Sequence, residues 1–142
     1  MIVDVDPKFS TQTKARKAAL DLLFQADMRG LSIIKVLDEQ RALAETPIRP
    51  FTIELVQGVA QHLQQIDRRI NDCAAGNWTV ARMPRVDRNL ARIAMYEIDH
   101  SETPDAVAIA QAIELATWLS TNESPAFLNG LLGQAARSKT AN

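Results

Sequence analysis

Apolar residues recur at intervals of three and four along most of this chain, and that spacing restricts what the chain can fold into. Alternating runs rich in β-branched residues, which favour strands, are absent from the sequence. The longest stripe with the helical spacing comprises Phe51, Leu55, Val59, Leu63, Ile66 and Ile70. The pattern therefore predicts an all-α protein.

Start and stop signals divide this pattern into about six to seven helices. Gly30 provides a helix end, Ser32 an N-cap, and the pairs Thr103-Pro104 and Ser124-Pro125 provide helix starts. The segment 51–73 is expected to form one continuous helix, which at 1.5 Å per residue would be roughly 33 Å long. The other expected helices span about 12–28, 32–43, 85–97, 104–119 and 124–135.

The expected organisation is a mobile arm at 1–11 followed by two helical bundles that form one compact domain. The bundles are expected to cover 12–75 and 76–142, because a Gly76-Asn77-Trp78 hinge separates the third expected helix from the rest. The segment 104–119 is apolar almost all round, and such a helix is expected at the centre of a bundle.

Composition restricts the possible functions. Sixteen basic and seventeen acidic side chains give a net charge of -1, so the chain lacks the overall positive field of a non-specific nucleic-acid binder. A lone Cys73 and two histidines argue against a disulfide or a metal site. Neither a membrane-spanning run nor a signal peptide is evident, which predicts a cytoplasmic protein.

Positive charge nevertheless gathers in two short segments. Residues 8–20 contain no acid, and their basic members are Lys8, Lys14, Arg16 and Lys17. Residues 82–92 contain one acid, Asp87, and their basic members are Arg82, Arg85, Arg88 and Arg92. Any nucleic-acid binding is expected to come from these local patches.

The segment 85–97 sorts its residues onto two sides when it is placed on a helix. Val86, Leu90 and Ile93 fall on one side. The opposite side carries Arg85, Arg88, Arg92 and Tyr96, with Asn89 beside them. An arginine row that ends in an aromatic suits phosphate contact together with stacking on an unpaired base. The alternative is an ordinary solvated helix face.

The first expected helix has the same division. Its inner face is rich in alanine, whereas Leu20 and Phe24 are expected to point outward beside Lys17. These two side chains either contact a partner protein or an RNA base, or are covered by a neighbouring helix.

Glu97 and Glu114 project into apolar stripes, so we expect each to anchor an arginine or a helix end. A catalytic carboxylate pair is the poorer alternative, because the sequence supplies no nucleophile–base set.

Four segments in order resemble the NusB family of bacterial transcription antitermination factors. They are ARKAALDLLFQAD (15–27), RVDRNLARIAMYEI (85–98), PDAVAIAQAIELA (104–116) and FLNGLLGQAA (127–136). The resemblance implies two packed three-helix bundles with no enzymatic activity and no cofactor. It also implies binding of the single-stranded boxA element of nascent ribosomal RNA, together with the ribosomal protein NusE, in an antitermination complex on RNA polymerase.

The resemblance also implies a role for individual positions. Those implied for RNA binding are Lys14, Arg16, Lys17, Phe24, Arg88, Arg92, Phe127 and Asn129. Asp87 matches an acidic position associated with the NusE contact, and Phe24 lies near the same partner surface. The chain departs from the family where lysines replace arginines on the first helix, because lysine cannot make the planar bidentate phosphate contact of arginine. Phe24 also lacks the tyrosine hydroxyl, and Ala126 stands where a basic residue is common.

A second interpretation is a protein-only scaffold. In it Leu20 and Phe24 form a partner-binding or homodimer interface, and the arginine row is solvated surface with little affinity for RNA. Sedimentation with and without RNA would separate the two interpretations.

Overall fold

The computed structural model describes residues 9–76 and 78–139, and within this part of the chain every regular element is helical. The all-α prediction is therefore confirmed. The elements are α1 (Thr11–Arg29), α2 (Ile33–Leu43), α3 (Pro50–Gln61), α4 (Leu63–Cys73), the 3₁₀ turn η1 (Val80–Arg82), α5 (Arg85–His100), α6 (Asp105–Leu119) and α7 (Ser124–Arg137).

The helix ends follow the expected local chemistry. The hydroxyl of Ser10 accepts a hydrogen bond from the Thr13 N–H, and the hydroxyl of Ser32 does the same for Lys35. Gly30 ends α1 with φ of 66°, a left-handed conformation that glycine adopts without steric cost. Ser10 thus marks the start of α1, Gly30 marks its end, and Ser32 marks the start of α2.

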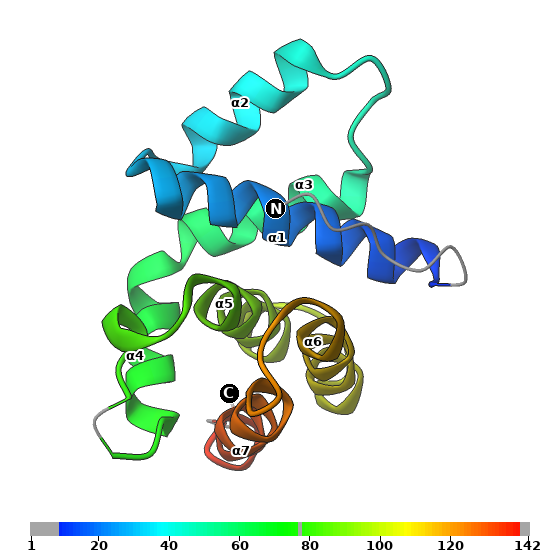
Figure 1. The fold of residues 1–142 in the computed structure, drawn as a ribbon. Coiled ribbons are helices and arrows are strands. Elements are labelled where there is room, and N and C mark those ends of the chain that lie inside the picture. Colours follow the sequence, from blue (N-terminus) through cyan, green and yellow to red (C-terminus); the bar gives the residue numbers. More distant parts are fainter. Residues whose placement is uncertain (1–8, 77, 140–142) are drawn as a thin grey trace.

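The helices form two groups, with α1, α2 and α3 above and α4 to α7 below in Figure 1. Helix α5 is viewed along its axis in the middle of that figure, and it contacts α1, α3, α4, α6 and α7. Ten of its residues are buried, including Leu90, Met95 and Ile98. Helix α5 is thus the common core element of both groups.

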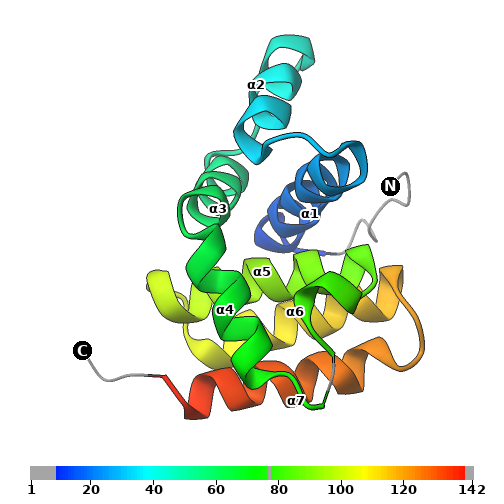
Figure 2. The same cartoon turned by 90° about the vertical axis from the view of Figure 1, so that its left-hand side faces the viewer.

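The single helix expected for 51–73 is wrong. At His62 the backbone leaves helical geometry, with φ of −112° and ψ of 19°, and the chain continues as α4 in a new direction (Figure 2). Helix α4 packs against α5 and α7. These contacts place α4 in the lower group, whereas the boundary expected near Gly76 would place α4 in the upper group. The apolar spacing runs through the break unaltered, so periodicity gave no sign of it.

Helix α6 is not at the centre of a bundle, contrary to expectation. It lies at one side of the lower group in Figure 1, where Val107 is 44% exposed and Trp118 is 47% exposed. The central position belongs to α5 instead, because α5 is the helix that both groups cover. In the described residues no helix is long and apolar enough to cross a membrane.

The arm expected at 1–11 falls mostly outside the described residues, as does Lys8. Its described end is ordered by contacts. Phe9 meets Trp118 edge to face with ring centroids 5.4 Å apart, and Ser10 caps α1.

Candidate nucleic-acid interface

The arginine row of α5 lies against other helices and not against solvent. Arg88 donates from Nε to the Asp27 carboxylate of α1 at 2.6 Å, and its Nη2 donates to the other carboxylate oxygen. Arg92 makes the same two-pronged contact with Asp67 of α4, at 2.8 and 3.0 Å. Both arginine side chains are only about one-seventh exposed. The two predicted phosphate contacts are therefore already occupied by carboxylates.

Asn89 connects the two pairs at the centre of this contact. Its amide nitrogen donates to Asp27 at 3.0 Å, and its amide oxygen accepts from Arg92 at 3.0 Å. Burial alone would raise the pKa of the Asp27 carboxyl. The hydrogen bonds from Arg88 and Asn89, with the charges of Arg88 and Arg92, outweigh burial and hold that pKa below its ordinary value. Asp27 therefore stays ionised and holds the arginines in place.

Arg16 is buried and does not face solvent, contrary to its expected place on an RNA surface. Its guanidinium donates from Nε and Nη2 to the two carboxylate oxygens of Glu97 at 2.8 and 2.7 Å. The same group lies over the ring of Phe51, 5.0 Å from its centroid. The hypothesis that Glu97 anchors an arginine is confirmed. Arg16 ties α1 to α5 and cannot reach phosphate in this conformation.

A fourth pair completes the contact around α5. Arg69 of α4 donates to Asp99 at 2.7 and 2.9 Å and to the Ala135 carbonyl at 2.9 Å. We call the four pairs the arginine seam; they are Arg16–Glu97, Arg88–Asp27, Arg92–Asp67 and Arg69–Asp99. Each pair joins α5 to α1 or α4, so the seam fastens the helices around the central one.

Tyr96 and Leu20 also lie inside the protein, so their expected outward positions are wrong. Tyr96 is buried against Gly58 of α3, and its ring occupies the place that a Cβ on Gly58 would take. Leu20 is fully buried in the core. Helix α1 is packed by α2 and α3 on one side and by α5 on the other, which covers both of its faces. The partner interface predicted for Leu20 is therefore contradicted.

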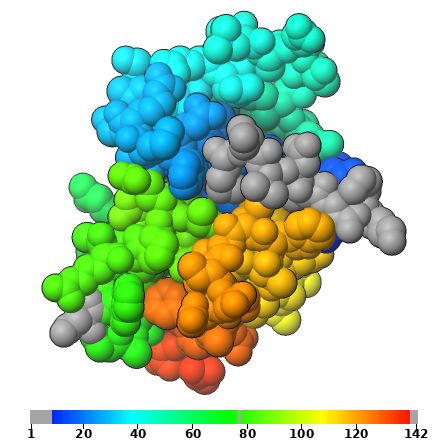
Figure 3. Space-filling model, viewed as in Figure 1, coloured from blue at the N-terminus to red at the C-terminus, as the bar shows by residue number. Residues whose placement is uncertain are grey.

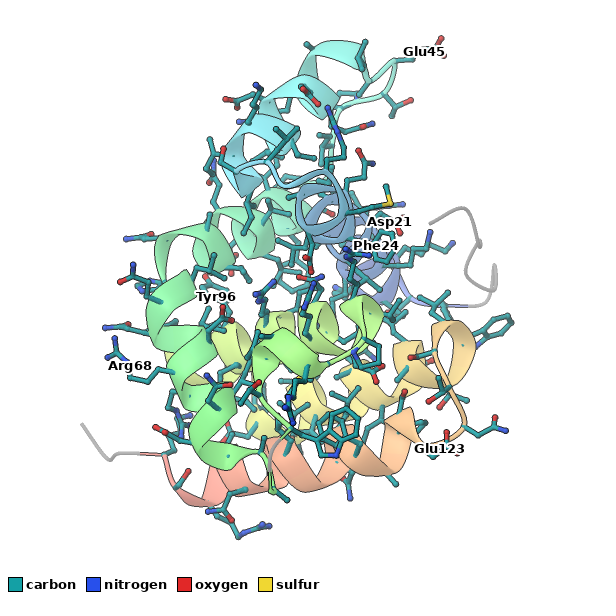
Figure 4. The ribbon with its side chains drawn as sticks, turned by 60° about the vertical axis from the view of Figure 1, so that its left-hand side comes forward. Asp21, Phe24, Glu45, Arg68, Tyr96 and Glu123 are labelled. Carbon is teal, nitrogen blue, oxygen red and sulfur yellow. The ribbon has the colours of Figure 1, made fainter. Side chains whose placement is uncertain are left out.

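The remaining predicted positions on α1 differ in exposure. Lys14 and Phe24 are half-buried, and Figure 4 labels Phe24 beside Asp21 on α1. Lys17 is buried, and its ammonium contacts the Asp21 carboxylate at 2.6 Å. Of the three basic residues predicted on this helix, Lys14 alone forms no ion pair with another described residue.

Asp87, predicted as a partner contact, is buried and holds the turn between α6 and α7. Its carboxylate accepts hydrogen bonds from the hydroxyls of Ser120 and Ser124, the latter at 2.9 Å. Ser124 is the first residue of α7. Asp87 thus links the start of α5 to the start of α7. It is also one of the residues that line a cavity.

That cavity has a volume of about 390 Å³ and brings two aromatic side chains together. Trp78, which is 53% exposed, and Phe127 have ring centroids 6.2 Å apart with planes tilted by 58°. Figure 3 shows the start of α7 set back between the green segment before α5 and the orange turn after α6. The lining residues are Trp78, Pro84, Asp87, Thr121, Glu123, Ser124 and Phe127.

Two exposed arginines adjoin Pro84, a lining residue of this cavity, in the sequence, although neither of them lines it. Arg82 and Arg85 stand on either side of Pro84, and the Arg85 side chain is 49% exposed, 3.7 Å from Asp27. Phe127, predicted from the C-terminal motif, belongs to the cavity. Asn129 is exposed two residues further along α7 and does not line it. We call the cavity with Trp78, Phe127, Arg82 and Arg85 the aromatic site.

Trp78 was missed as a site residue by sequence reasoning. Its neighbours Gly76 and Asn77 indicate a turn, and the tripeptide was interpreted only as a boundary. The available signal was a large aromatic beside a turn and four residues before Arg82, but nothing in the sequence places Trp78 next to Phe127.

A family model described as the NusB family matches residues 13–137 of this chain. The transcription antitermination protein NusB of Cutibacterium acnes is 49% identical over 124 residues, covering 87% of this chain and 48% of that protein. This chain thus spans about half the length of that relative. The protein of the same name from Salinispora tropica is 52% identical, covering 89% of this chain and 96% of its own length.

Solved structures are similar over nearly the whole chain. A crystal structure of T. maritima NusB superposes with a TM-score of 0.80 at 29% identity, covering 93% of this chain and 94% of that one. A chain in the crystal structure of antitermination factors NusB and NusE in complex with dsRNA superposes with a TM-score of 0.76. At 19% identity over 89% of this chain and 96% of the other, that likeness concerns the fold.

Proposed function

This chain belongs to the NusB family, and from that membership we propose that it is a transcription antitermination factor that binds RNA together with NusE. The family consists of RNA-binding adaptors and not of enzymes. The RNA that we propose is the single-stranded boxA element of nascent ribosomal RNA, bound in a cytoplasmic antitermination complex on RNA polymerase. A solved structure of the same fold contains NusB and NusE in complex with dsRNA, which supports the binding of RNA and NusE in general.

The observation that carries the proposal is the aromatic site. Its volume of about 390 Å³ accommodates an unpaired base, and Trp78 and Phe127 offer ring faces for stacking. Asp87 and Glu123 line the same cavity. Their carboxylates repel phosphate but accept hydrogen bonds from the amino group of a base, so we propose that a base enters and the backbone stays outside.

Phosphate contacts are proposed for the cations that have the most freedom. Arg82 and Arg85 are exposed and lie next to Pro84 of the cavity in the sequence, and Lys14 is a half-buried residue near the start of α1 that forms no ion pair with another described residue. Arg88 and Arg92, together with Arg16, then act on RNA indirectly, by holding α1 and α4 against α5. Asn129 is exposed near the aromatic site on α7 and remains a proposed RNA contact.

The NusE contact is proposed for the side of α1 that carries Phe24. This ring is half-buried and therefore offers one apolar edge to a partner. We propose that Asp87 acts on the partner or RNA surface indirectly, because its hydrogen bonds from Ser120 and Ser124 hold the turn between α6 and α7 in place.

The test is a fluorescence anisotropy titration of labelled boxA RNA, with a scrambled RNA of equal length as control. Each titration is run at two salt concentrations, with and without NusE. We expect selective binding that weakens with salt and tightens when NusE is present. Equal affinity for both RNAs in every condition would contradict the boxA assignment, and selective binding that NusE leaves unchanged would contradict the cooperative role of the partner.

A further inference from the structure

The joint between α3 and α4 carries two imidazole rings in face-to-face contact. His62 and His100 stack with ring centroids 3.9 Å apart and planes within 8° of parallel. Tyr96 of α5 extends this stack, because its ring centroid is 6.4 Å from that of His62 and 6.1 Å from that of His100. Figure 4 labels Tyr96 near the joint. The chain has two histidines, and both belong to the stack, so histidine protonation acts nowhere else.

His62 stands at the break between the two helices. Its N–H donates to the Gly58 carbonyl at 3.1 Å and ends α3, whereas its carbonyl accepts from the Ile66 N–H at 2.8 Å and begins α4. His100 is the last residue of α5. The stack therefore joins the point where the chain changes direction to the end of the central helix (Figure 2).

The stack accommodates one proton more easily than two. Two neutral imidazoles, or one imidazolium and one neutral ring, lie face to face without charge repulsion. Two imidazolium rings with centroids 3.9 Å apart repel each other, so the second proton is disfavoured while the rings stay stacked. A state in which the rings have separated takes up the second proton more readily, and acid therefore favours that state.

The charges around His100 agree with this behaviour. Burial and then the charge of His62 lower the pKa of the His100 imidazole below its ordinary value of 6.5. The charge of Asp99 acts in the opposite direction, but Arg69 of α4 already holds that carboxylate with two hydrogen bonds, at 2.7 and 2.9 Å. Among the described residues, His62 and Asp99 are the charged groups that act on His100.

Two further carboxylates near the stack act on Tyr96. Burial, together with Glu54 of α3 and Glu97 of α5, raises the pKa of the Tyr96 hydroxyl above its ordinary value of 10.0. Tyr96 therefore stays neutral in acid, and the two imidazoles are the members of the stack that gain charge as the pH falls.

We propose that the stacked rings of His62 and His100 form an acid-sensitive latch that holds the start of α4 against the end of α5. With no proton or one proton the latch is closed, and with two protons the rings separate and the first turn of α4 loosens. The inference goes beyond the proposed RNA binding and does not depend on it.

The first test is an NMR titration of the imidazole protons, which is simple because the chain has two histidines. We expect the pair to titrate in two steps separated by about one pH unit or more. His62→Phe keeps a ring on His100 but removes the second charge, so the midpoint of His100 should rise toward 6.5. Two histidines that titrate together near pH 6.5, with no change in His62→Phe, overturn the proposal.

The second test measures whether acid loosens α4. Ile66→Cys in a Cys73→Ala background places a thiol in the first turn of α4 at a position that is 1% exposed. Its rate with dithiodipyridine, which reacts with thiols in weak acid, is divided by the rate of a small free thiol at the same pH. We expect this ratio to rise at least about fivefold from pH 7 to pH 5. An unchanged ratio overturns the proposal.

Two controls separate the latch from a general effect of acid. Val36→Cys in the same background is the matched thiol, because it is also 1% exposed but lies on α2, which packs on α1 and α3. Its ratio should stay constant, and an equal rise there overturns the proposal because the whole protein would then loosen. Adding His100→Phe to Ile66→Cys keeps a stacked ring without its charge and should abolish the rise. A rise that survives His100→Phe also overturns the latch.

Discussion

The arginine seam and the aromatic site both include arginines of α5, but these arginines differ in exposure and in their contacts with carboxylates. In the seam Arg88 and Arg92 each hold a carboxylate with two nitrogens and are only about one-seventh exposed. At the aromatic site Arg85 is 49% exposed, and its nearest carboxylate is 3.7 Å away. Arginines a single turn apart thus differ in how closely a carboxylate from another helix contacts them.

A row of arginines on a helix therefore does not by itself make a nucleic-acid surface. A guanidinium fits carboxylate and phosphate equally well in geometry. In this protein Asp27 and Asp67 supply the carboxylates, so two members of the row hold the fold together. The row member that stays largely exposed is Arg85, at the start of α5.

The largest effect is expected from breaking the most buried pair of the seam. Glu97→Ala leaves the Arg16 guanidinium buried without its carboxylate, since these residues are 1% and 5% exposed. Loss of one partner of a buried ion pair costs about 3–5 kcal/mol of unfolding free energy. Urea denaturation followed by circular dichroism measures that change.

The matched control for this variant is Glu39→Ala. Glu39 also accepts from an arginine, Arg29, at 2.8 Å, but both side chains are about 40% exposed. We expect no measurable loss of stability there. Equal unfolding curves for Glu97→Ala and Glu39→Ala would contradict the structural role that we assign to the seam.

A smaller effect is expected from Asp27→Asn, and it should depend on pH. An amide cannot replace both charged hydrogen bonds to Arg88, and such bonds contribute about 1.5–3 kcal/mol. The pKa of the Asp27 carboxyl is lower in the folded protein than its ordinary value of 3.8. Its contribution to stability is therefore complete above about pH 5 and is lost as the pH falls through the folded pKa.

The measurement is the free energy of unfolding of both proteins between pH 7 and pH 3. The stability difference between the protein and Asp27→Asn should be constant down to about pH 5 and should shrink below about pH 4. A difference that grows as the pH falls would show that Asp27 is not the ionised partner of Arg88.

Much of the fold was predictable because its signals are local. The caps at Ser10 and Ser32 and the left-handed Gly30 depend on neighbouring residues, so their chemistry can be interpreted from short segments. The break at His62 was not predictable in this way. The apolar spacing continues through it, and the new direction of α4 is fixed by packing on α5 and α7.

The site was predictable in part, for a related reason. Phe127 was identified by a resemblance that covers a contiguous motif. Arg16 bonds to Glu97 and Arg92 bonds to Asp67, and each carboxylate is far away in sequence from its arginine. A helical wheel shows one helix alone, so it cannot show which carboxylates of other helices contact it. Periodicity shows that a face differs from the core stripe but does not show whether another helix covers it.

The next largest effect is expected from removing one ring of the aromatic site. Trp78→Ala should weaken binding of the proposed RNA by about 1–3 kcal/mol, which is the usual contribution of one stacked base, and should leave the unfolding free energy unchanged. Anisotropy titration measures the affinity. Trp118→Ala is the matched control, because this second tryptophan is 47% exposed against 53% for Trp78. Equal losses for the two variants would remove the aromatic site from the RNA surface.

The smallest expected effect is on the salt dependence of binding. If Arg82 and Arg85 each hold one phosphate, Arg82→Gln with Arg85→Gln should make the slope of log affinity against log salt shallower by about 1.4, roughly 0.7 for each contact. Arg41→Gln with Arg68→Gln removes two exposed arginines elsewhere, and Figure 4 shows Arg68 far from Glu123 of the aromatic site. That control should keep the original slope. If the control flattens the slope as much as the test variant, RNA responds to total charge, and the exposed end of the α5 row has no special role.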